Sequence, residues 1–422
     1  MKKTRFGFLL LILVLFPVYA GAVDYGLLLN QYGGFRNSED NEFVFDYSAS
    51  LIPRFSFLIG DMGSFFMSAS LNIGYMYKFY FYPELLRTEL SLNFGQIGMN
   101  AGRITYSAPF DYIAAGLFDG IQFSHSSGAG HFGLGAWYTG LQYKKSANIV
   151  MTSGDQLLFS SELDYSNFFE TYFAPKRLLA SAFWEHPSIG EIFQFNAAVL
   201  GQVDFSEDDI YHNQYLMLKV GFPFDRFLFE LGGSLEAAQM KRPEITAGNG
   251  GTPVIVIPNE YSFKLAFSGE LGFYWTLPTN FNSRFSFVGR YTSGEFKDNE
   301  ILGAFIPVTS KSMGEIFTVK MSGITVLSLD YSARIVNGLG TVFSFSYFIR
   351  NDLETLHSFP LTSELAEHNL LGGELYARFV FSPMSDLQVK LSGGAFFPQM
   401  GNIWTEEKIL WKMDITAILS LY

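Results

Sequence analysis

Charged side chains alternate with apolar ones along several stretches of this chain, and that spacing limits the chemistry they can do. In residues 261–275, Lys264 and Glu270 share one face, while Tyr261, Phe263 and Trp275 share the other. Strict alternation is typical of a β-strand with one apolar side and one polar side. Charges on such strands form a hydrated wall, which acts on dissolved ions through electrostatics rather than by making bonds.

If such strands close into a barrel, the charged residues on their polar faces line one shared lumen. Neither positive nor negative side chains dominate among those residues. A hydrated lumen tolerates charge, whereas Lys or Arg on a lipid-exposed face at the midplane costs about 2–4 kcal/mol. Two interpretations remain open: ion pairs that neutralise each other and hold the wall in shape, or a basic ladder on the last seven strands that guides an anionic solute. The predicted wall residues are Arg87, Glu89, Arg103, Lys219, Lys264, Glu270, Arg284, Arg290, Asp330, Arg334, Arg350, Glu374, Arg378, Lys390 and Lys412, with Asp46, Glu230, Glu236 and Asp414 of the same character.

Residue types that could catalyse a reaction or bind a metal are present without the spacing that either role needs. The six histidines are scattered, and none belongs to an HExxH motif. The nearest group of ligands is Asp208, Asp209 and His212, in an acidic segment that we expect to be an exposed loop. The absence of cysteine excludes thiol catalysis and Cys-ligated metal. We therefore predict neither an enzyme nor a cofactor.

Period-two patterns broken by Gly, Pro, Asn and Asp predict about eighteen strands, with sixteen as the alternative even number. Short links alternate with longer ones along the whole chain, which is the asymmetry expected of an outer-membrane barrel. We therefore predict an all-β, antiparallel, up-and-down transmembrane barrel. The predicted longer links are residues 36–41, 81–84, 107–117, 144–175, 206–214, 240–260, 296–323, 352–369 and 398–408.

The first 22 residues have the pattern of a secretory signal peptide. Lys2, Lys3 and Arg5 precede an apolar run at residues 6–16, and Ala20-Gly21-Ala22 offers a cleavage site with small residues. Residues 23–422 would then form a single barrel domain. The formal net charge of −12 makes nucleic acid an improbable partner.

One predicted link, residues 144–175, is too apolar to project freely into water. We expect it to fold back over or into the barrel, either as a constriction or as packing that keeps a wide barrel from collapsing. Its apolar residues are Leu157, Leu158, Phe159, Phe168, Phe169, Tyr172 and Phe173.

The last segment alternates from Trp411 to Leu421 and ends in the aromatic residue Tyr422. In this it resembles the outer-membrane porin families, whose last residue is typically aromatic, although Tyr422 lies on the polar face here. The resemblance implies outer-membrane lipid and the barrel assembly machinery as partners.

A second, local resemblance lies in Asn100-Ala-Gly-Arg-Ile-Thr-Tyr106 followed by Phe118-Asp-Gly-Ile121. These residues resemble the strand, loop and strand of alginate-export-type barrels. The resemblance implies a pore for an acidic polysaccharide with Arg103 in its wall. Asp119 has the parity of Ile121 and Phe123, and we expect it at the membrane rim.

Together these patterns predict an integral outer-membrane, porin-like channel through which small hydrophilic or anionic solutes diffuse passively. A surface-exposed structural or adhesive barrel is the alternative from another class, and a facilitator for hydrophobic compounds is a second transport alternative.

Overall fold

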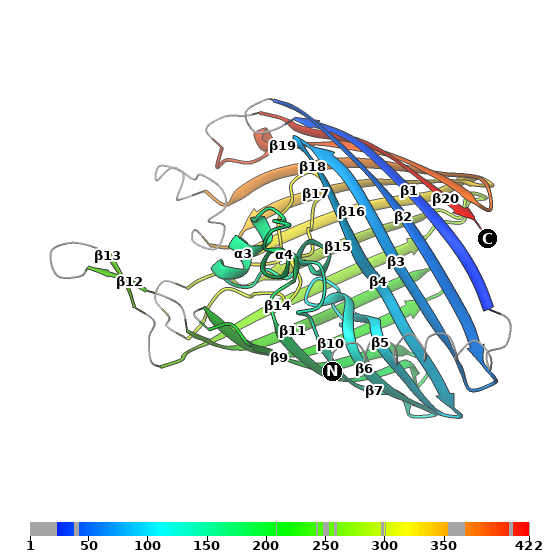
Figure 1. The fold of residues 1–422 in the computed structure, drawn as a ribbon, viewed down its shortest axis with the longest axis horizontal. Helices are drawn as coiled ribbons and strands as arrows, with labels where there is room; N and C mark the ends of the chain where they lie inside the picture. Colours follow the sequence, from blue (N-terminus) through cyan, green and yellow to red (C-terminus); the bar gives the residue numbers. More distant parts are fainter. Residues whose placement is uncertain are drawn as a thin grey trace.

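The computed structural model describes residues 23–37, 42–207, 209–241, 244–247, 253–256, 260–296, 299, 301–352, 368–404 and 408–421. Eighteen antiparallel strands each pair with the next along the chain, and β20 pairs with β1, so the sheet closes on itself (Figure 1). This confirms the predicted 18-stranded up-and-down barrel and excludes the 16-stranded alternative.

The barrel strands are β1 (Val23–Asn37), β2 (Phe43–Ile59), β3 (Gly63–Met76), β4 (Lys78–Phe94), β5 (Ile97–Ser107), β6 (Ala115–Ser127), β7 (Gly130–Tyr138), β8 (Arg177–Ile189), β9 (Phe193–Asp204), β10 (Ile210–Phe224), β11 (Phe227–Lys241), β14 (Ser262–Thr276), β15 (Arg284–Thr292), β16 (Ile324–Val336), β17 (Leu339–Arg350), β18 (Leu370–Met384), β19 (Leu387–Phe397) and β20 (Leu410–Leu421). A separate hairpin of β12 (Glu244–Ala247) and β13 (Pro253–Val256) lies between β11 and β14. The short helices are α2 (Lys144–Ala147), α3 (Ser153–Ser160), α4 (Phe168–Tyr172) and η3 (Pro398–Met400). None of the helices in the described ranges is long and apolar enough to cross a membrane.

The two faces of the wall differ as the alternation predicts. On β14, Phe263, Leu265 and Leu271 are exposed on the outside of the barrel, whereas Ser268 and Glu270 are buried inside it. Apolar side chains outside and polar ones inside reverse the arrangement of a water-soluble protein, and this reversal is the arrangement of membrane barrels.

Short turns gather at one end of the barrel and longer loops at the other, which we call the short-turn end and the long-loop end. One predicted loop is wrong: residues 81–84 lie inside β4, because β3 turns directly into β4 at Tyr77, whose φ is 62°. Pro83 resembled a strand breaker in the sequence. It is tolerated in β4 because a proline, which has no N–H, can occupy a strand edge that lacks a partner.

That edge exists because the end of the β5–β6 hairpin leaves the wall. Pairing of β4 with β5 stops at Thr88 and Arg103, and pairing of β6 with β7 stops at Asp119 and Tyr138. Beyond these points β5 and β6 pair only with each other. Gly102 makes the departure possible, since its φ is 113° and a Cβ there would lie 2.1 Å from the carbonyl oxygen of Thr88.

Arg103 fastens the point where the strands separate. Its guanidinium donates to both carboxylate oxygens of Asp119 on β6, at 2.9 and 2.8 Å, to the carbonyl of Leu85 on β4, and to that of Leu141 in the β7–β8 loop. Only 4% of Arg103 is exposed. The buried Arg103 guanidinium therefore links β4, β6 and the β7–β8 loop, which form no backbone pairing with one another at this point.

We expect Arg103→Leu to destabilise the barrel, because removing one partner of a buried ion pair costs about 3–5 kcal/mol. Loss of the compact, heat-modifiable band on an electrophoresis gel should occur at a lower temperature than in the wild type. Arg284→Leu is the matched control, because this arginine stacks on Tyr274 and forms no ion pair in the described part of the chain. Equal transition temperatures for the two variants would contradict the fastening role.

Candidate functional site

The inward-folded hairpin end, residues 104–118, crosses the lumen to the opposite wall. Phe110 and Tyr112 are each 1% exposed. The hydroxyl of Tyr112 lies 3.1 Å from that of Ser268 on β14, and the Phe110 ring lies over Gly232 on β11, where a Cβ would approach to 2.5 Å. The hairpin end therefore forms a bar across the bore.

A second barrier segment lies against this bar, namely the described part of residues 293–323 between β15 and β16. The carbonyl of Ile113 accepts hydrogen bonds from the backbone of Val308 and Thr309, at 2.8 and 3.2 Å. Further along, the Glu374 carboxylate on β18 accepts the backbone N–H groups of residues 315–317 at 2.8–3.0 Å. Phe305, Val308 and Met321 are fully buried in the same apolar cluster as the bar.

The β7–β8 loop was predicted to form the constriction through its apolar residues between 157 and 173. It contacts the barrier through residues 148–151 instead. Ile149 and Met151 join the buried cluster, and the backbone of Asn148 accepts from Ser310 at 2.7 Å. Of the predicted apolar residues, Tyr172 is buried, Leu157 and Phe169 are 73% and 79% exposed, and Leu158, Phe159, Phe168 and Phe173 are half-buried.

A buried ion triad anchors the β7–β8 loop to the wall. Arg177, at the start of β8, lies 2.6 Å from Asp155 of α3 and 3.0 Å from Asp204 of β9, and all three side chains are at most 4% exposed. Asp155 also caps α3 with the Thr152 hydroxyl in a capping box. Burial raises the pKa of Asp155, and the positive charge of Arg177 opposes that rise.

Two lysines at the entrance to the loop are affected by burial as well. The Lys144 ammonium donates to the carbonyl and hydroxyl of Ser161, at 2.7 and 2.6 Å. Desolvation lowers the pKa of both Lys144 and Lys145. The Lys145 ammonium lies 4.0 Å from the centre of the Phe159 ring, a cation–π contact within the loop.

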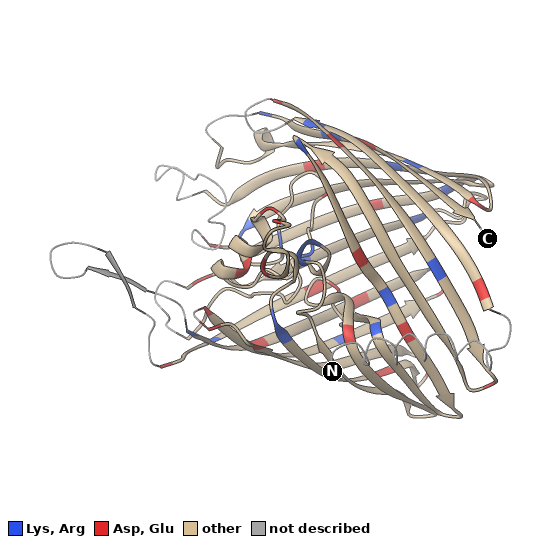
Figure 2. Cartoon of the chain, in the orientation of Figure 1, with Lys and Arg blue, Asp and Glu red and all other residues tan. Residues whose placement is uncertain are grey.

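Most predicted wall charges lie in pairs. Lys219 lies 3.0 Å from Glu230 and 3.1 Å from Glu270, and Arg290 lies 2.7 Å from Glu270 on the other side, so one network spans β10 to β15. Figure 2 shows both signs spread over the strands. The other pairs are Arg87–Glu89 at 2.7 Å, Lys264–Glu295 at 2.5 Å, Arg378–Glu315 at 2.9 Å, Lys412–Asp414 at 3.7 Å and Arg103–Asp119 at 2.8 Å.

The remaining wall residues divide into two groups. Arg350, Glu236 and Glu374 hold loop backbone: Arg350 donates to the His368 carbonyl at 2.7 Å, Glu236 accepts from the Ile306 N–H at 2.8 Å, and Glu374 binds residues 315–317. Arg284, Asp330, Arg334 and Lys390 form no ion pair within the described ranges. Three of these four are basic, so the unneutralised charge there is positive.

Arg103 and Asp119 lie apart from the other wall charges. They pair on the face of β6 that also carries Ile121 and Phe123, both exposed on the outside. The Leu141 carbonyl covers the pair from the loop.

The two described side chains of the nearest group of ligands, Asp209 and His212, form hydrogen bonds with their neighbours. Among the described residues, no three His, Asp or Glu side chains lie close enough to hold a metal ion. Asp208 is outside the described residues. Asp209 accepts from Ser153 and Gly154 of the loop, and His212 accepts from the backbone of Asp204.

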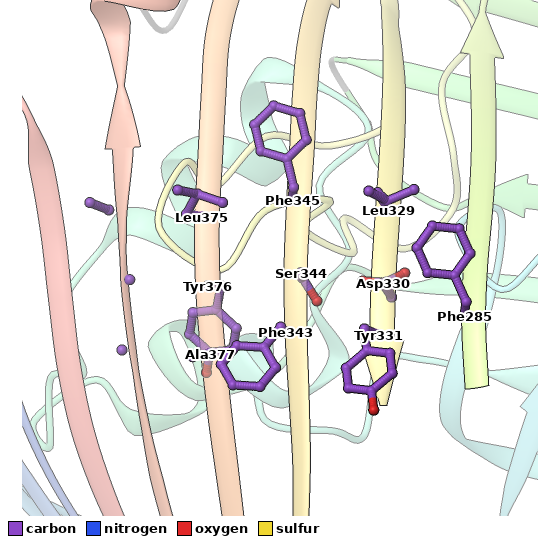
Figure 3. Close-up of a pocket in the computed structure, with 13 residues that line it drawn as sticks. Phe285, Leu329, Asp330, Tyr331, Phe343, Ser344, Phe345, Leu375, Tyr376 and Ala377 are labelled. Atoms are coloured by element: carbon purple, nitrogen blue, oxygen red, sulfur yellow. The ribbon is translucent and has the colours of Figure 1, made fainter. Parts of the chain in front are cut away.

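Two hollows differ in the side of the wall on which they lie. A groove of about 520 Å³ is on the outer surface over β15 to β19, between Phe285, Leu329, Phe343 and Leu375 and above the small residue Ala377 (Figure 3). An inner cavity of about 230 Å³ lies beside the bar and is more polar, with Tyr106, Gln122, His131 and Glu185 in its lining.

No protein-family model matches the sequence, and no curated protein matches it. Solved structures of Pseudomonas aeruginosa proteins do match over nearly the whole barrel. The outer membrane protein OpdK matches with a TM-score of 0.58 and 10% identity, over 95% of this chain and 98% of that one. This chain has the fold of that outer-membrane protein. OccK2 (OpdF) in complex with glucuronate matches with a TM-score of 0.56 and 12% identity, over 95% and 98% of the chains, and OpdK with vanillate with 0.56 and 11%, over 94% and 98%.

Sequence reasoning missed the bar and the barrier segment at residues 293–323. Both follow from a signal that was present, namely apolar residues in links that should be polar: Phe110, Tyr112 and Ile113 in one, and Phe305, Ile306 and Val308 in the other. The Arg177 triad was not foreseen, because its three members come from separate elements.

We expect Arg177→Met to release the β7–β8 loop, since it leaves Asp155 and Asp204 buried without their cation, at a cost of about 3–5 kcal/mol. Chymotrypsin should cut within residues 144–175 faster than in the wild type, while the strands stay protected. Adding Asp155→Asn should restore part of the protection by removing one buried charge. Unchanged cleavage in the single variant would show that the triad does not anchor the loop.

Proposed function

We propose that this protein is an integral outer-membrane channel for passive diffusion of small hydrophilic solutes, exported with cleavage of residues 1–22. The observation that carries the proposal is a closed 18-stranded barrel with an apolar outside, a charged inside, and a folded bar across its bore. A barrel of this strand number is wide enough for an aqueous channel. The bar, with its buried aromatic residues Phe110 and Tyr112, narrows this bore.

Anionic solutes are the favoured class. Arg284, Arg334 and Lys390 form no ion pair in the described ranges and outnumber Asp330, the one acid of that group, and the similar structures OccK2 and OpdK were solved with glucuronate and with vanillate. We therefore propose that the remaining charges keep the wall in shape, and that these three basic residues favour anions.

The partners that go with this function are outer-membrane lipid around the apolar surface and the assembly machinery that folds barrels. No cofactor is proposed. An adhesive or structural barrel without transport remains the competing function, and a barrel that folds but passes no current in a planar bilayer would support it.

Replacing residues 109–113 by a short Gly-Ser linker should raise single-channel conductance severalfold, because Phe110 and Tyr112 would no longer cross the bore. Conductance is measured in planar bilayers, with heat-modifiable mobility as the check on folding. Removing residues 244–256, the β12–β13 hairpin, is the control and should leave conductance unchanged. Equal conductance in all three proteins would place the narrow point elsewhere.

Neutralising Arg284, Arg334 and Lys390 to Gln should lower the anion-to-cation permeability ratio, which is read from the reversal potential across a salt gradient. Arg87→Gln combined with Glu89→Gln is the matched control, because it removes an ion pair without changing net charge. A reversal potential unaffected by the triple substitution would contradict the anion preference.

A further inference from the structure

The unpaired edge of β4 is sealed by side chains in place of a neighbouring strand. The Phe81 N–H donates to the Tyr165 hydroxyl at 3.0 Å, and the Phe81 carbonyl accepts from the same hydroxyl. The Pro83 carbonyl accepts from the Tyr172 hydroxyl at 2.7 Å, and the Leu85 carbonyl accepts from Arg103. Positions 81, 83 and 85 are every second residue of β4. The backbone groups of every second residue in a strand point to the same side, and here that side is the unpaired edge.

This seal lies within the apolar outer surface and not above it. Leu71, Ile73 and Phe81 are 45–49% exposed on the outside of β3 and β4, and Leu141 is 55% exposed beyond the gap. Lipid offers no hydrogen bonds, so an open edge there would cost several kcal/mol for each unsatisfied group. The tyrosine hydroxyls therefore close the wall beside the exposed apolar residues Leu71, Ile73 and Phe81.

The covering segment can move without opening any ladder. Between β4 and residues 143–173 the contacts are side-chain hydrogen bonds and one tilted ring pair, Tyr82 with Tyr143, whose centres are 4.2 Å apart. An ion pair between Lys78 and Glu162 is exposed on both sides and therefore weak. The pairing of β3 with β4 and the Arg177 triad include none of these contacts.

The covering segment also presents apolar surface to the outside. Leu157, Tyr165 and Phe169 are 73%, 59% and 79% exposed, in a stretch of the loop that is mostly exposed. Exposed apolar side chains gathered beside an opening mark a place where an apolar molecule can bind.

We propose that the gap between β4 and the inward-folded β5–β6 hairpin is a lateral passage, which delivers small uncharged apolar molecules from the long-loop end into the surrounding bilayer. The exposed side chains of residues 157–169 bind the molecule first. Separation of Tyr165 and Tyr172 from the β4 edge then opens a route sideways through the wall. This route is distinct from the aqueous path along the bore.

The test locks the covering segment to β4. Ser146 donates to the Glu84 carboxylate at 2.9 Å across the gap, and the chain has no cysteine, so Glu84→Cys with Ser146→Cys supplies the only two thiols. A short reducible bismaleimide bridges them. Ser328→Cys with Ser346→Cys is the matched control, since these hydroxyls lie 3.1 Å apart on strands that are already paired.

The readout is entry of N-phenyl-1-naphthylamine into cells with an intact lipopolysaccharide leaflet, which excludes this uncharged dye until it reaches phospholipid. We expect the wild-type barrel to accelerate entry over cells without it, the lock to abolish that acceleration, and reduction of the bridge to restore it. The control bridge should have no effect. Entry through the locked barrel at the unlocked rate, or no acceleration by the wild type, would overturn the proposal.

A second variant guards against a lock that only disturbs folding. Tyr165→Phe with Tyr172→Phe keeps the rings but removes the hydroxyls, and losing the three hydrogen bonds that they form should speed entry by about tenfold or more. Unchanged entry in a barrel of normal heat-modifiable mobility would also overturn the lateral passage. Conductance of the locked barrel is measured in parallel and should equal that of the wild type, so a failed lateral route and a failed channel give different results.

Discussion

The constraint on which the whole structure depends is that every backbone polar group facing an apolar surrounding must find a partner within the chain. Closure of β20 onto β1 meets that requirement for the sheet as a whole. It also fixes which side chains face in and which face out, because a closed sheet with period-two alternation has two chemically separate surfaces. The charged wall and the apolar exterior both follow from that single condition.

The β5–β6 hairpin is a local departure from this rule, and much of the interior follows from it. Folding inward, it supplies the bar across the bore and a platform for residues 293–323. It also removes the partner of β4. Pro83 has no N–H that needs a partner, and Arg103, Tyr165 and Tyr172 donate hydrogen bonds to the carbonyl groups of the β4 edge. The same rearrangement thus crosses the bore and leaves, at β4, an edge that is closed by side chains and not by a neighbouring strand.

Alternation and turn residues were enough to predict the strand number and the inside–outside assignment of residues such as Lys264 and Glu270, because both are set locally along each strand. They could not predict which loops fill the barrel, because that depends on contacts between residues far apart in sequence, such as Tyr112 with Ser268. The Gly-Arg and Phe-Asp-Gly motifs stood out in the sequence for a reason that the structure supplies. Gly102 allows the strands to separate, and Arg103 with Asp119 fastens the point of separation.

The tyrosine seal on β4 also has a consequence for the order of folding. Phe81 and Tyr165 are 84 residues apart in sequence, and Pro83 and Tyr172 are 89 apart, whereas neighbouring strands of a meander meet after a single turn. Contacts of such long sequence separation form late, because the loop entropy is lost before they contribute stability. The wall at β4 can therefore be complete only once Tyr165 and Tyr172, which follow β5, β6 and β7 in the chain, have packed against it.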